Sequence, residues 1–231
     1  MHMFSREKNF FGGHGIVGAQ VPIGCGLAFS HKYRDEANVC LTYLGDGAVN
    51  QGQVYESFNM AALWDLPVLF VIENNQYGMG TAVTRAAAGR SLAERGAAYG
   101  IPGRQVDGMD VLAVRKAGAE ALEHCRTGKG PYILEMKTYR YRGHSMSDPA
   151  KYRTREEVDA MRKQHDPIDQ LREVLHKQNV TEERLKDIDA DVKAIVLRAT
   201  EFAQTSPEPD PSELFTDILI PVGGRGAGME G

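Results

Sequence analysis

The chain has 231 residues, of which 42% are hydrophobic and 25% charged, with a formal net charge of -4 at pH 7. This composition is that of an ordinary globular protein, long enough to bury a core without disulfides or a structural metal. Because acidic and basic residues are well mixed and no apolar run approaches the ~20 residues of a membrane helix, we expect a cytoplasmic protein that binds neither nucleic acid nor membrane.

Segments typical of strands and helices alternate along the chain up to residue 139. Small residues from Gly24 to Ala28 predict a helix that packs closely on a neighbour and extends to Tyr33. Further elements are predicted as strands at 38–44, 68–72, 104–106 and 132–136, and as helices over 50–64, 91–99 and 110–125, the last capped by Asp110. This order predicts right-handed parallel βαβ units, and therefore an α/β fold with a doubly wound, mainly parallel sheet.

The chain changes character after residue 139. Polar and aromatic residues without a period predict a loop over 139–155. Thr154 and Glu157 form a capping-box pattern that predicts the start of one helix, and Pro167 in a first helical turn predicts another. A long amphipathic helix is expected over 181–205, with its charge run as a solvated face.

These elements suggest one domain with a helical C-terminal extension. We expect the α/β core over residues 1–160, the helical part of the same domain over 161–206 and a tail over 207–231. The glycine-rich end of the tail, from Val222 onward, is predicted to be disordered.

Polar residues follow two neighbouring strands of the predicted sheet at the point where each strand ends. Asp46 comes directly after the first strand, and Asn74 and Asn75 come after the second. Adjacent strands lie ~4.8 Å apart, so Asp46 and one asparagine can share a small ion at the carboxyl edge of the sheet. A carboxylate, an amide oxygen and a loop carbonyl are typical Mg²⁺ ligands, whereas the Gly45-Asp46-Gly47 string alone is also typical of a plain turn.

The whole pattern of Gly-Asp-Gly, a helix, a strand and then Asn-Asn resembles the thiamin diphosphate motif. The resemblance implies that Asp46, Asn75 and the main-chain carbonyl of Tyr77 hold Mg²⁺. It also implies that Gly47 and Ala48 lie against the diphosphate, and that the fold is the thiamin-diphosphate-binding fold.

Four longer segments resemble the alpha subunits of pyruvate dehydrogenases, in the thiamin-diphosphate-dependent 2-oxoacid dehydrogenase family; they are residues 12–22, 59–64, 73–81 and 139–149. The resemblance runs from about Phe4 to Leu214. It implies oxidative decarboxylation of pyruvate and acetyl transfer to lipoamide, carried out with a beta subunit, a second alpha chain in an α2β2 heterotetramer, and the lipoyl domain of an acetyltransferase component.

The same resemblance assigns further site residues. Main-chain groups of Gly15 and Val17 would contact the aminopyrimidine, although tight helix packing also accounts for the glycines of that segment. His144 would face the diphosphate and the channel entrance, order its loop and assist acetyl transfer, which makes it the catalytic candidate of this chain. Ser145 matches the regulatory phosphorylation position of mitochondrial relatives, but the shorter loop after it, without a second serine, predicts an enzyme without that regulation.

Some parts of the family pattern are not found in this chain. No glutamate is identified for the aminopyrimidine, and the resemblance implies that the beta subunit supplies it. A Tyr-Arg pair for the diphosphate and a histidine near the reacting carbon, both from a segment before Met1, are also missing, which predicts a fragment, a misread start or a decayed activity. A branched-chain 2-oxoacid or acetoin dehydrogenase alpha subunit, and a truncated assembly module without catalysis, therefore stay open as alternatives.

Overall fold

The computed structural model describes residues 2–89 and 91–216. The chain divides into two units, Met1–Val174 and Leu175–Gly231, and each is described by itself. The predicted domain boundaries at residues 160 and 206 stay predictions. The disorder predicted from Val222 onward lies outside the described residues.

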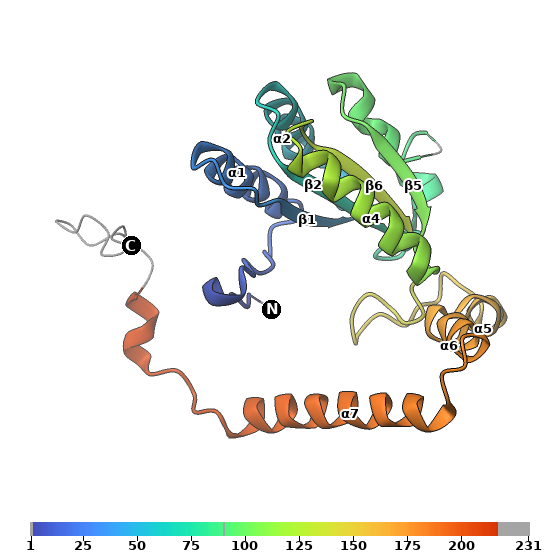
Figure 1. The fold of residues 1–231 in the computed structure, drawn as a ribbon. Coiled ribbons are helices and arrows are strands. Elements are labelled where there is room, and N and C mark those ends of the chain that lie inside the picture. Colours follow the sequence, from blue (N-terminus) through green and yellow to red (C-terminus); the bar gives the residue numbers. More distant parts are fainter. Residues whose placement is uncertain (1, 90, 217–231) are drawn as a thin grey trace. The chain divides into compact units, whose positions relative to one another are not determined.

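The first unit is built around a sheet of four parallel strands (Figure 1). In spatial order these are β1 (Cys40–Gly45), β2 (Val68–Asn74), β6 (Tyr132–Lys137) and β5 (Gly103–Asp107). β1 and β2 are joined through a helix, as are β5 and β6, which is the βαβ arrangement. The predicted α/β fold with a mainly parallel sheet is confirmed.

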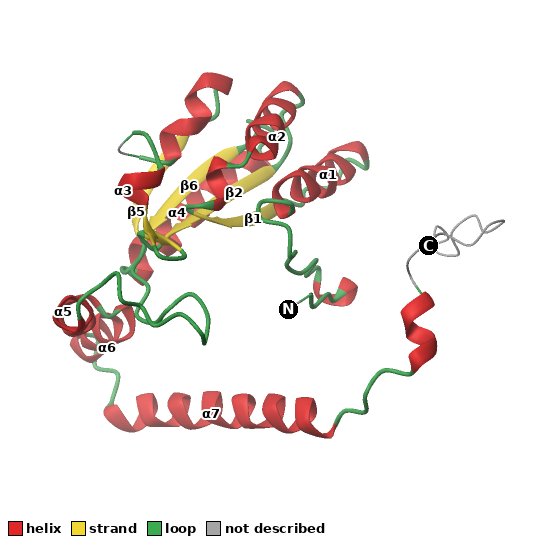
Figure 2. Cartoon of the chain, turned by 180° about the vertical axis from the view of Figure 1, so that it is seen from behind, coloured by secondary structure: helices red, strands yellow, loops and turns green. Residues whose placement is uncertain are grey.

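Helices cover both faces of this sheet (Figures 1 and 2). On one face α1 (Gln20–Tyr33), α2 (Gly52–Leu63) and the 3₁₀ helix η3 (Ala93–Tyr99) pack against alternate residues of β2, including Phe70. On the other face α4 (Val111–Arg126) packs against the intervening residues of β2 and β6. Because successive side chains of a strand point to opposite faces, β2 contributes to both cores and is buried almost throughout.

The predicted starts of three helices are confirmed, two of them with their capping residue. Asp110 Oδ1 accepts from the backbone N–H of Leu112 (2.9 Å) at the start of α4. Thr154 Oγ1 accepts from the backbone N–H of Glu157 (3.1 Å) at the start of α5 (Arg155–His165). The Glu157 carboxylate accepts the hydroxyl of Tyr139 (2.7 Å) and so ties α5 to the preceding loop; among the described residues no reciprocal bond from the Thr154 N–H to this carboxylate is seen, so only the Thr154 half of the capping box is confirmed. α6 (Pro167–Lys177) begins at the predicted proline.

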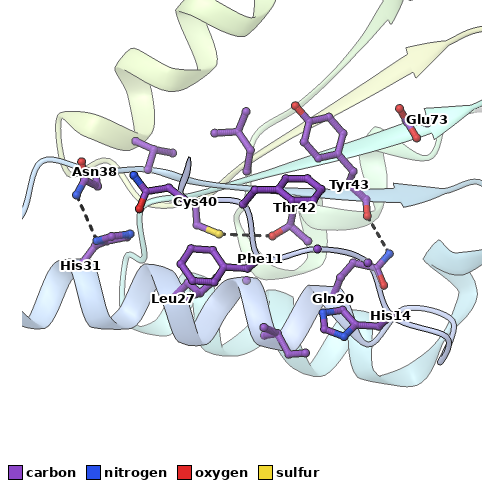
Figure 3. A pocket seen from close by; sticks show the side chains of 18 of the residues that line it. Phe11, His14, Gln20, Leu27, His31, Asn38, Cys40, Thr42, Tyr43 and Glu73 are labelled. Atoms are coloured by element: carbon purple, nitrogen blue, oxygen red, sulfur yellow. Dashed lines mark hydrogen bonds between the residues drawn. The ribbon is translucent and has the colours of Figure 1, made fainter. Parts of the chain in front are cut away.

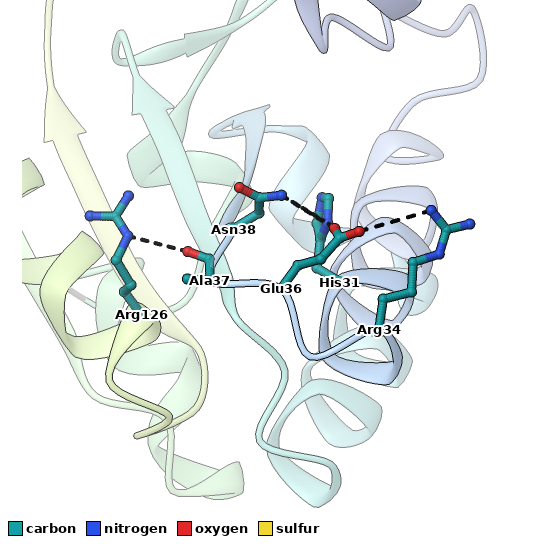
Figure 4. Close-up of polar contacts among 6 residues, drawn as sticks. All are labelled: His31, Arg34, Glu36, Ala37, Asn38 and Arg126. Carbon is teal, nitrogen blue, oxygen red and sulfur yellow. Dashed lines mark hydrogen bonds and ion pairs between the residues drawn. The ribbon is translucent and has the colours of Figure 1, made fainter. Parts of the chain in front are cut away.

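The connection between α1 and β1 is fixed by a small polar cluster (Figure 4). The carboxylate of Glu36 accepts from His31 Nδ1 (2.5 Å) and from Asn38 Nδ2 (3.2 Å). Arg126, at the end of α4, donates from Nε to the carbonyl of Ala37 (3.3 Å). The hydrogen bond from His31 is the largest cause of the lowered pKa of Glu36, which keeps this carboxylate ionised.

Several short elements have no counterpart in the sequence prediction. They are η1 (Arg6–Lys8), η2 (Ala48–Asn50), the antiparallel hairpin of β3 (Tyr77–Gly78) and β4 (Thr81–Ala82), α3 (Val83–Ala86) and η4 (Pro211–Phe215). The helix expected over 91–99 is the 3₁₀ helix η3. Of these corrections only the β3–β4 hairpin and η2 affect the candidate site, because they follow the two strand ends directly.

The second unit is dominated by α7 (Glu182–Thr205), whose start is capped by Thr181 Oγ1 accepting from Arg184 N (3.3 Å). Of the residues of α7, Leu185 is buried. Large apolar side chains of this helix are exposed in the single chain, namely those of Ile188, Val192, Ile195, Val196, Leu197 and Phe202. Among the described residues of both units, no helix has the length and hydropathy needed to cross a membrane.

Candidate functional site

The ends of β1 and β2 place Asp46 beside the turn that carries Asn75 and Tyr77. Gly45 pairs in register with Glu73, so Asp46 follows one strand at the level where Asn74 completes the next. The side chain of Asp46 is buried, at 4% exposure. The hairpin after β2 folds back onto the same turn, because a Cβ placed on Gly78 would lie 3.5 Å from Gly47 Cα and 3.8 Å from Asp46 Oδ2.

The turn between β2 and β3 is held by both asparagines. Asn74 Oδ1 accepts from the backbone N–H of Gln76 (3.1 Å), and Asn75 Oδ1 accepts from the backbone N–H of Tyr77 (3.3 Å). Gln76 has a φ of 76°, a left-handed conformation that a side chain other than glycine rarely adopts. The two side-chain bonds stabilise this turn, and with it the position of the Tyr77 carbonyl.

The guanidinium of Arg140 lies beside the carbonyl of Tyr77. Arg140 Nη2 donates to this oxygen (2.8 Å), and Arg140 Nη1 donates to the carbonyl of Met79 (3.2 Å). Burial raises the pKa of Asp46, while a backbone hydrogen bond and the charge of Arg140 oppose that rise without cancelling it. The buried carboxylate and the turn carbonyls therefore form a place where positive charge is favourable.

Each ligand type in this set suits a hard divalent cation. A carboxylate from Asp46, an amide oxygen from Asn75 and the carbonyl of Tyr77 are the oxygen donors that Mg²⁺ prefers, with water and phosphate completing the shell. Among the described residues no group of three or more His, Cys, Asp and Glu side chains could hold a metal ion. These residues therefore do not form a cage of carboxylates or histidines. They fit a cation that would take its remaining ligands from water and from a phosphate.

The glycine-rich segment over 12–18 lies against the start of α2. Gln53 Nε2 donates to the carbonyl of Val17 (2.9 Å), and a Cβ on Gly18 would lie 3.3 Å from the Gln51 side chain. Val17 is itself exposed, and a Cβ on Gly15 would have only the ring of His2 nearby, at 3.4 Å. The segment thus packs next to the helix that follows Gly47 and Ala48, with its apolar side chains facing outward.

The loop that carries His144 is anchored by an aspartate. Asp148 Oδ2 accepts from the backbone N–H of His144 (2.7 Å) and from the hydroxyl of Tyr152 (2.8 Å), while Oδ1 accepts from Ala150 N (2.8 Å). The bond from His144 is the largest cause of the lowered pKa of Asp148. The ring of Tyr152 lies 5.0 Å from that of Tyr77, so the loop rests on the β3–β4 hairpin. The His144 side chain is exposed.

Arg153 is a second anchor of this loop, and sequence reasoning missed it. Its guanidinium is buried among aromatic rings, 5.6 Å from the centroid of Tyr77, 5.3 Å from Tyr139 and 5.4 Å from Tyr152. Its Nη2 also donates to the carbonyl of Arg142 (2.9 Å). The density of tyrosines in 139–152 was the available signal, since aromatic faces favour a buried cation.

Glu135 is the other residue that the sequence prediction left out. It lies in the middle of β6, with 0% exposure, and accepts hydrogen bonds from Asn74, Ser91, Leu92, Ala93 and Gln105. Burial raises the pKa of Glu135, but the hydrogen bonds, of which that from Asn74 is the largest, hold it below its ordinary value. A charged residue inside an otherwise apolar strand was the signal, because such a group is buried only with partners.

Several cavities lie near these elements, and two of them are lined in part by β1. One of about 840 Å³ runs beside β1 and α1 (Figure 3), where Gln20 Nε2 donates to the carbonyl of Tyr43 (2.8 Å). None of the residues predicted to bind cofactor or metal lines it. A second cavity, of about 520 Å³, is lined by Asn75 and Arg140 among others. Of these two, the second cavity therefore adjoins the candidate ligand set.

The sequence matches a known protein family and several individual proteins. The family described as "Dehydrogenase E1 component" matches residues 1–212. The chain is 64% identical over 221 residues to the pyruvate dehydrogenase E1 component subunit alpha of Rhizobium meliloti, covering 95% of this chain and 64% of the relative. The protein of the same name from Zymomonas mobilis is 59% identical over 220 residues, covering 95% and 62%.

A mitochondrial relative is also similar. The testis-specific alpha subunit of the pyruvate dehydrogenase E1 component from Rattus norvegicus is 55% identical over 216 residues, covering 93% of this chain and 54% of the relative. The chain therefore spans less than two thirds of the length of these three relatives.

Proposed function

The chain belongs to the dehydrogenase E1 component family, and on that premise we propose that it acts as the alpha subunit of a pyruvate dehydrogenase. The reaction is the oxidative decarboxylation of pyruvate with transfer of the acetyl group to lipoamide. The observation that carries the proposal is the meeting of Asp46 with the 74–78 turn at the carboxyl edge of two adjacent parallel strands. The names of the relatives favour pyruvate over branched-chain oxoacids or acetoin.

The proposed cofactors are thiamin diphosphate and Mg²⁺. Asp46, Asn75 and the carbonyl of Tyr77 would hold the metal, and Gly47 and Ala48 would lie against the diphosphate. When bound, thiamin diphosphate supplies an electron sink for the decarboxylation. The protein's part is to hold and orient: the buried carboxylate and turn carbonyl would attract the cation, and the open space beside Gly45, where a Cβ has no atom within 4 Å, would leave room for phosphate oxygens.

The segment over 12–18 is proposed to carry the aminopyrimidine contacts. Gly15 and Val17 would offer main-chain groups to the ring. The position of this segment against the start of α2 supports the assignment, because α2 follows the turn of Gly47 and Ala48. The carbonyl of Val17 accepts from Gln53, which fixes the main chain of this segment at the position from which it would meet the ring.

We propose a beta subunit as the obligatory partner, with a second alpha chain in an α2β2 assembly and the lipoyl domain of an acetyltransferase component. The buried carboxylate of Glu135 is occupied by donors of its own chain and is not available to the aminopyrimidine, and we propose that the beta subunit supplies the glutamate for that ring. Exposed apolar residues such as Ile16, Val17 and those of α7 supply surface for protein contacts. We propose the cytoplasm as the location of the assembly.

The proposal is tested by reconstitution. The chain is co-expressed with a matching beta subunit, and pyruvate-dependent reduction of an artificial electron acceptor is measured with and without thiamin diphosphate and Mg²⁺. Activity that requires both cofactors and the partner is the expected result. A stable complex without turnover would instead indicate an assembly module, and preference for a branched-chain oxoacid or acetoin in competition assays would reassign the substrate.

His144 gives a prediction for the second half of the reaction. In the reconstituted enzyme, His144→Ala is expected to lower acetylation of lipoamide on the order of 100-fold, since a positioned proton donor or acceptor contributes about this much. Reduction of the artificial acceptor should fall less, because that assay bypasses the transfer. His165→Ala, an exposed histidine at the end of α5, is the matched control. Full lipoamide acetylation in the His144 variant would remove its catalytic role.

A further inference from the structure

The two oxygens of the Glu135 carboxylate serve different parts of the fold. Oε1 accepts from Asn74 Nδ2 (2.8 Å), at the end of β2. Oε2 accepts from Ser91 Oγ (2.8 Å), Leu92 N (2.8 Å), Ala93 N (3.2 Å) and Gln105 Nε2 (3.0 Å). One oxygen thus faces the 74–77 turn, which carries proposed metal ligands, and the other holds the start of η3 and the neighbouring strand β5.

An ionised carboxylate can only accept hydrogen bonds, and this fixes the orientation of the Asn74 amide. Since Nδ2 of Asn74 must point to Glu135, its Oδ1 must point the other way, where it accepts from the backbone N–H of Gln76 (3.1 Å). Gln76 is the residue with a φ of 76°. The orientation of one amide therefore decides whether the turn before Tyr77 has its acceptor.

We propose that Glu135 is a positioning residue: through the Asn74 amide it holds the 74–77 turn in the arrangement that presents Asn75 and the Tyr77 carbonyl to the metal. The turn-holding role stands on the contacts of this chain alone, whereas its consequence for metal and cofactor rests on the proposed function. Among the described residues no side-chain hydrogen bond joins Glu135 to Asp46, Asn75 or Tyr77, and its link to the 74–77 turn runs through Asn74.

The polarity of the contact makes Glu135→Gln a specific test. A glutamine has one oxygen, and the four donors on the Oε2 side favour placing it there. Its NH₂ group then faces Asn74, which has to turn its own oxygen toward residue 135. That rotation leaves an NH₂ group against the N–H of Gln76, so the turn loses its acceptor.

Two readouts are measured on the Glu135→Gln variant, hydrogen exchange on the chain itself and cofactor affinity on its reconstituted complex with the beta subunit. Amide hydrogen exchange at Gln76 and Tyr77 is expected to speed up, and this readout needs no cofactor. The affinity for thiamin diphosphate in the presence of Mg²⁺, measured by calorimetry, is expected to fall about 10- to 100-fold, as for other residues that orient metal ligands. Ser91→Ala removes a donor from the other oxygen and should leave both readouts near wild type. Glu123→Gln, an exposed glutamate of α4, is the control for charge.

The double variant Glu135→Gln/Asn74→Asp reverses the polarity of the pair. The aspartate introduced at position 74 accepts from the glutamine NH₂ with one oxygen and from the N–H of Gln76 with the other, so slow exchange and cofactor affinity should both return. Asn74→Asp alone places two carboxylates together, so its exchange at Gln76 and Tyr77 should be faster, and its cofactor affinity lower, than those of Glu135→Gln. If Glu135→Gln does not accumulate as folded protein, recovery of folded protein in the double variant supports the same pairing.

The outcomes separate this inference from the proposed function. Unchanged exchange at Gln76 and Tyr77 in Glu135→Gln, or failure of the double variant to restore it, would overturn the positioning role. Restored exchange without any recovery of affinity would overturn its link to the metal. If the wild-type chain and its reconstituted complex bind no thiamin diphosphate, the proposed function fails, while restored exchange still supports the role of Glu135 in holding the turn.

Discussion

Replacing Asp46 with alanine is expected to abolish Mg²⁺-dependent binding of thiamin diphosphate. Asp46 is the carboxylate among the three proposed ligands, and the other two, Asn75 and the carbonyl of Tyr77, are neutral. A divalent cation left with neutral protein oxygens loses its largest electrostatic attraction to the chain. Calorimetric titration of the reconstituted complex with thiamin diphosphate, with and without Mg²⁺, measures the effect directly.

The same substitution should not unfold the protein. Burial raises the pKa of Asp46 above its ordinary value despite the charge of Arg140. A carboxyl whose folded-state pKa lies above its unfolded value binds its proton more tightly in the folded state, so its ionisation at neutral pH opposes folding. Removing that carboxylate therefore removes an unfavourable contribution, and thermal unfolding without Mg²⁺ should occur at the wild-type temperature or slightly above it.

Two controls decide the interpretation. Asp46→Asn keeps the size of the side chain and should also lose most of the affinity, which separates charge from packing. Asp187→Asn alters an exposed aspartate of α7 and should bind cofactor like the wild type. Wild-type affinity in Asp46→Ala would remove Asp46 from the metal site. A collapse of stability in that variant would show that the carboxylate has a structural role that its burial does not suggest.

The main elements of the fold were predictable because they depend on short-range patterns. Residues only a few positions apart determine these elements, as in the apolar runs of β1 and β2 and in the helix start capped by Asp110. The convergence of Asp46 with Asn74 followed from one topological rule, that parallel strands bring their carboxyl ends to the same edge. The sequence was therefore sufficient to predict that the ends of β1 and β2 lie side by side.

The geometry around those strand ends was not predictable, because it depends on distant partners and on strained residues. Gln76 and Met79 adopt positive φ values of 76° and 53° without being glycine, so the residue types at these two positions do not predict the left-handed backbone of the tight hairpin. Glu135 draws its donors from three separate segments, and Arg153 draws its rings from two. A composition-based prediction of a loop over 139–155 was correct in outline but could not identify its anchors.

The close packing predicted for the small residues of α1 leads to a second large effect, on stability. Gly24 faces β1, where an added Cβ would lie 1.9 Å from Thr42 Oγ1 and 3.2 Å from Thr42 Cβ. Thr42 is buried at 4% exposure and is β-branched, so it has little freedom to move aside. Gly24→Ala is therefore expected to lower the free energy of unfolding by about 1–3 kcal/mol, the usual range for overpacking a core.

Gly26 provides the matched control within the same helix. It is exposed, and a Cβ placed there has no atom within 4 Å. Gly26→Ala should therefore raise the free energy of unfolding by about 0.5–1 kcal/mol, because alanine loses less backbone entropy in a helix than glycine does. Urea unfolding measures both variants, and Gly24→Ala/Thr42→Ala should recover part of the loss. Equal stabilisation by both single substitutions would mean that α1 can move away from β1, and the close packing of this helix on the sheet would then not constrain the sequence.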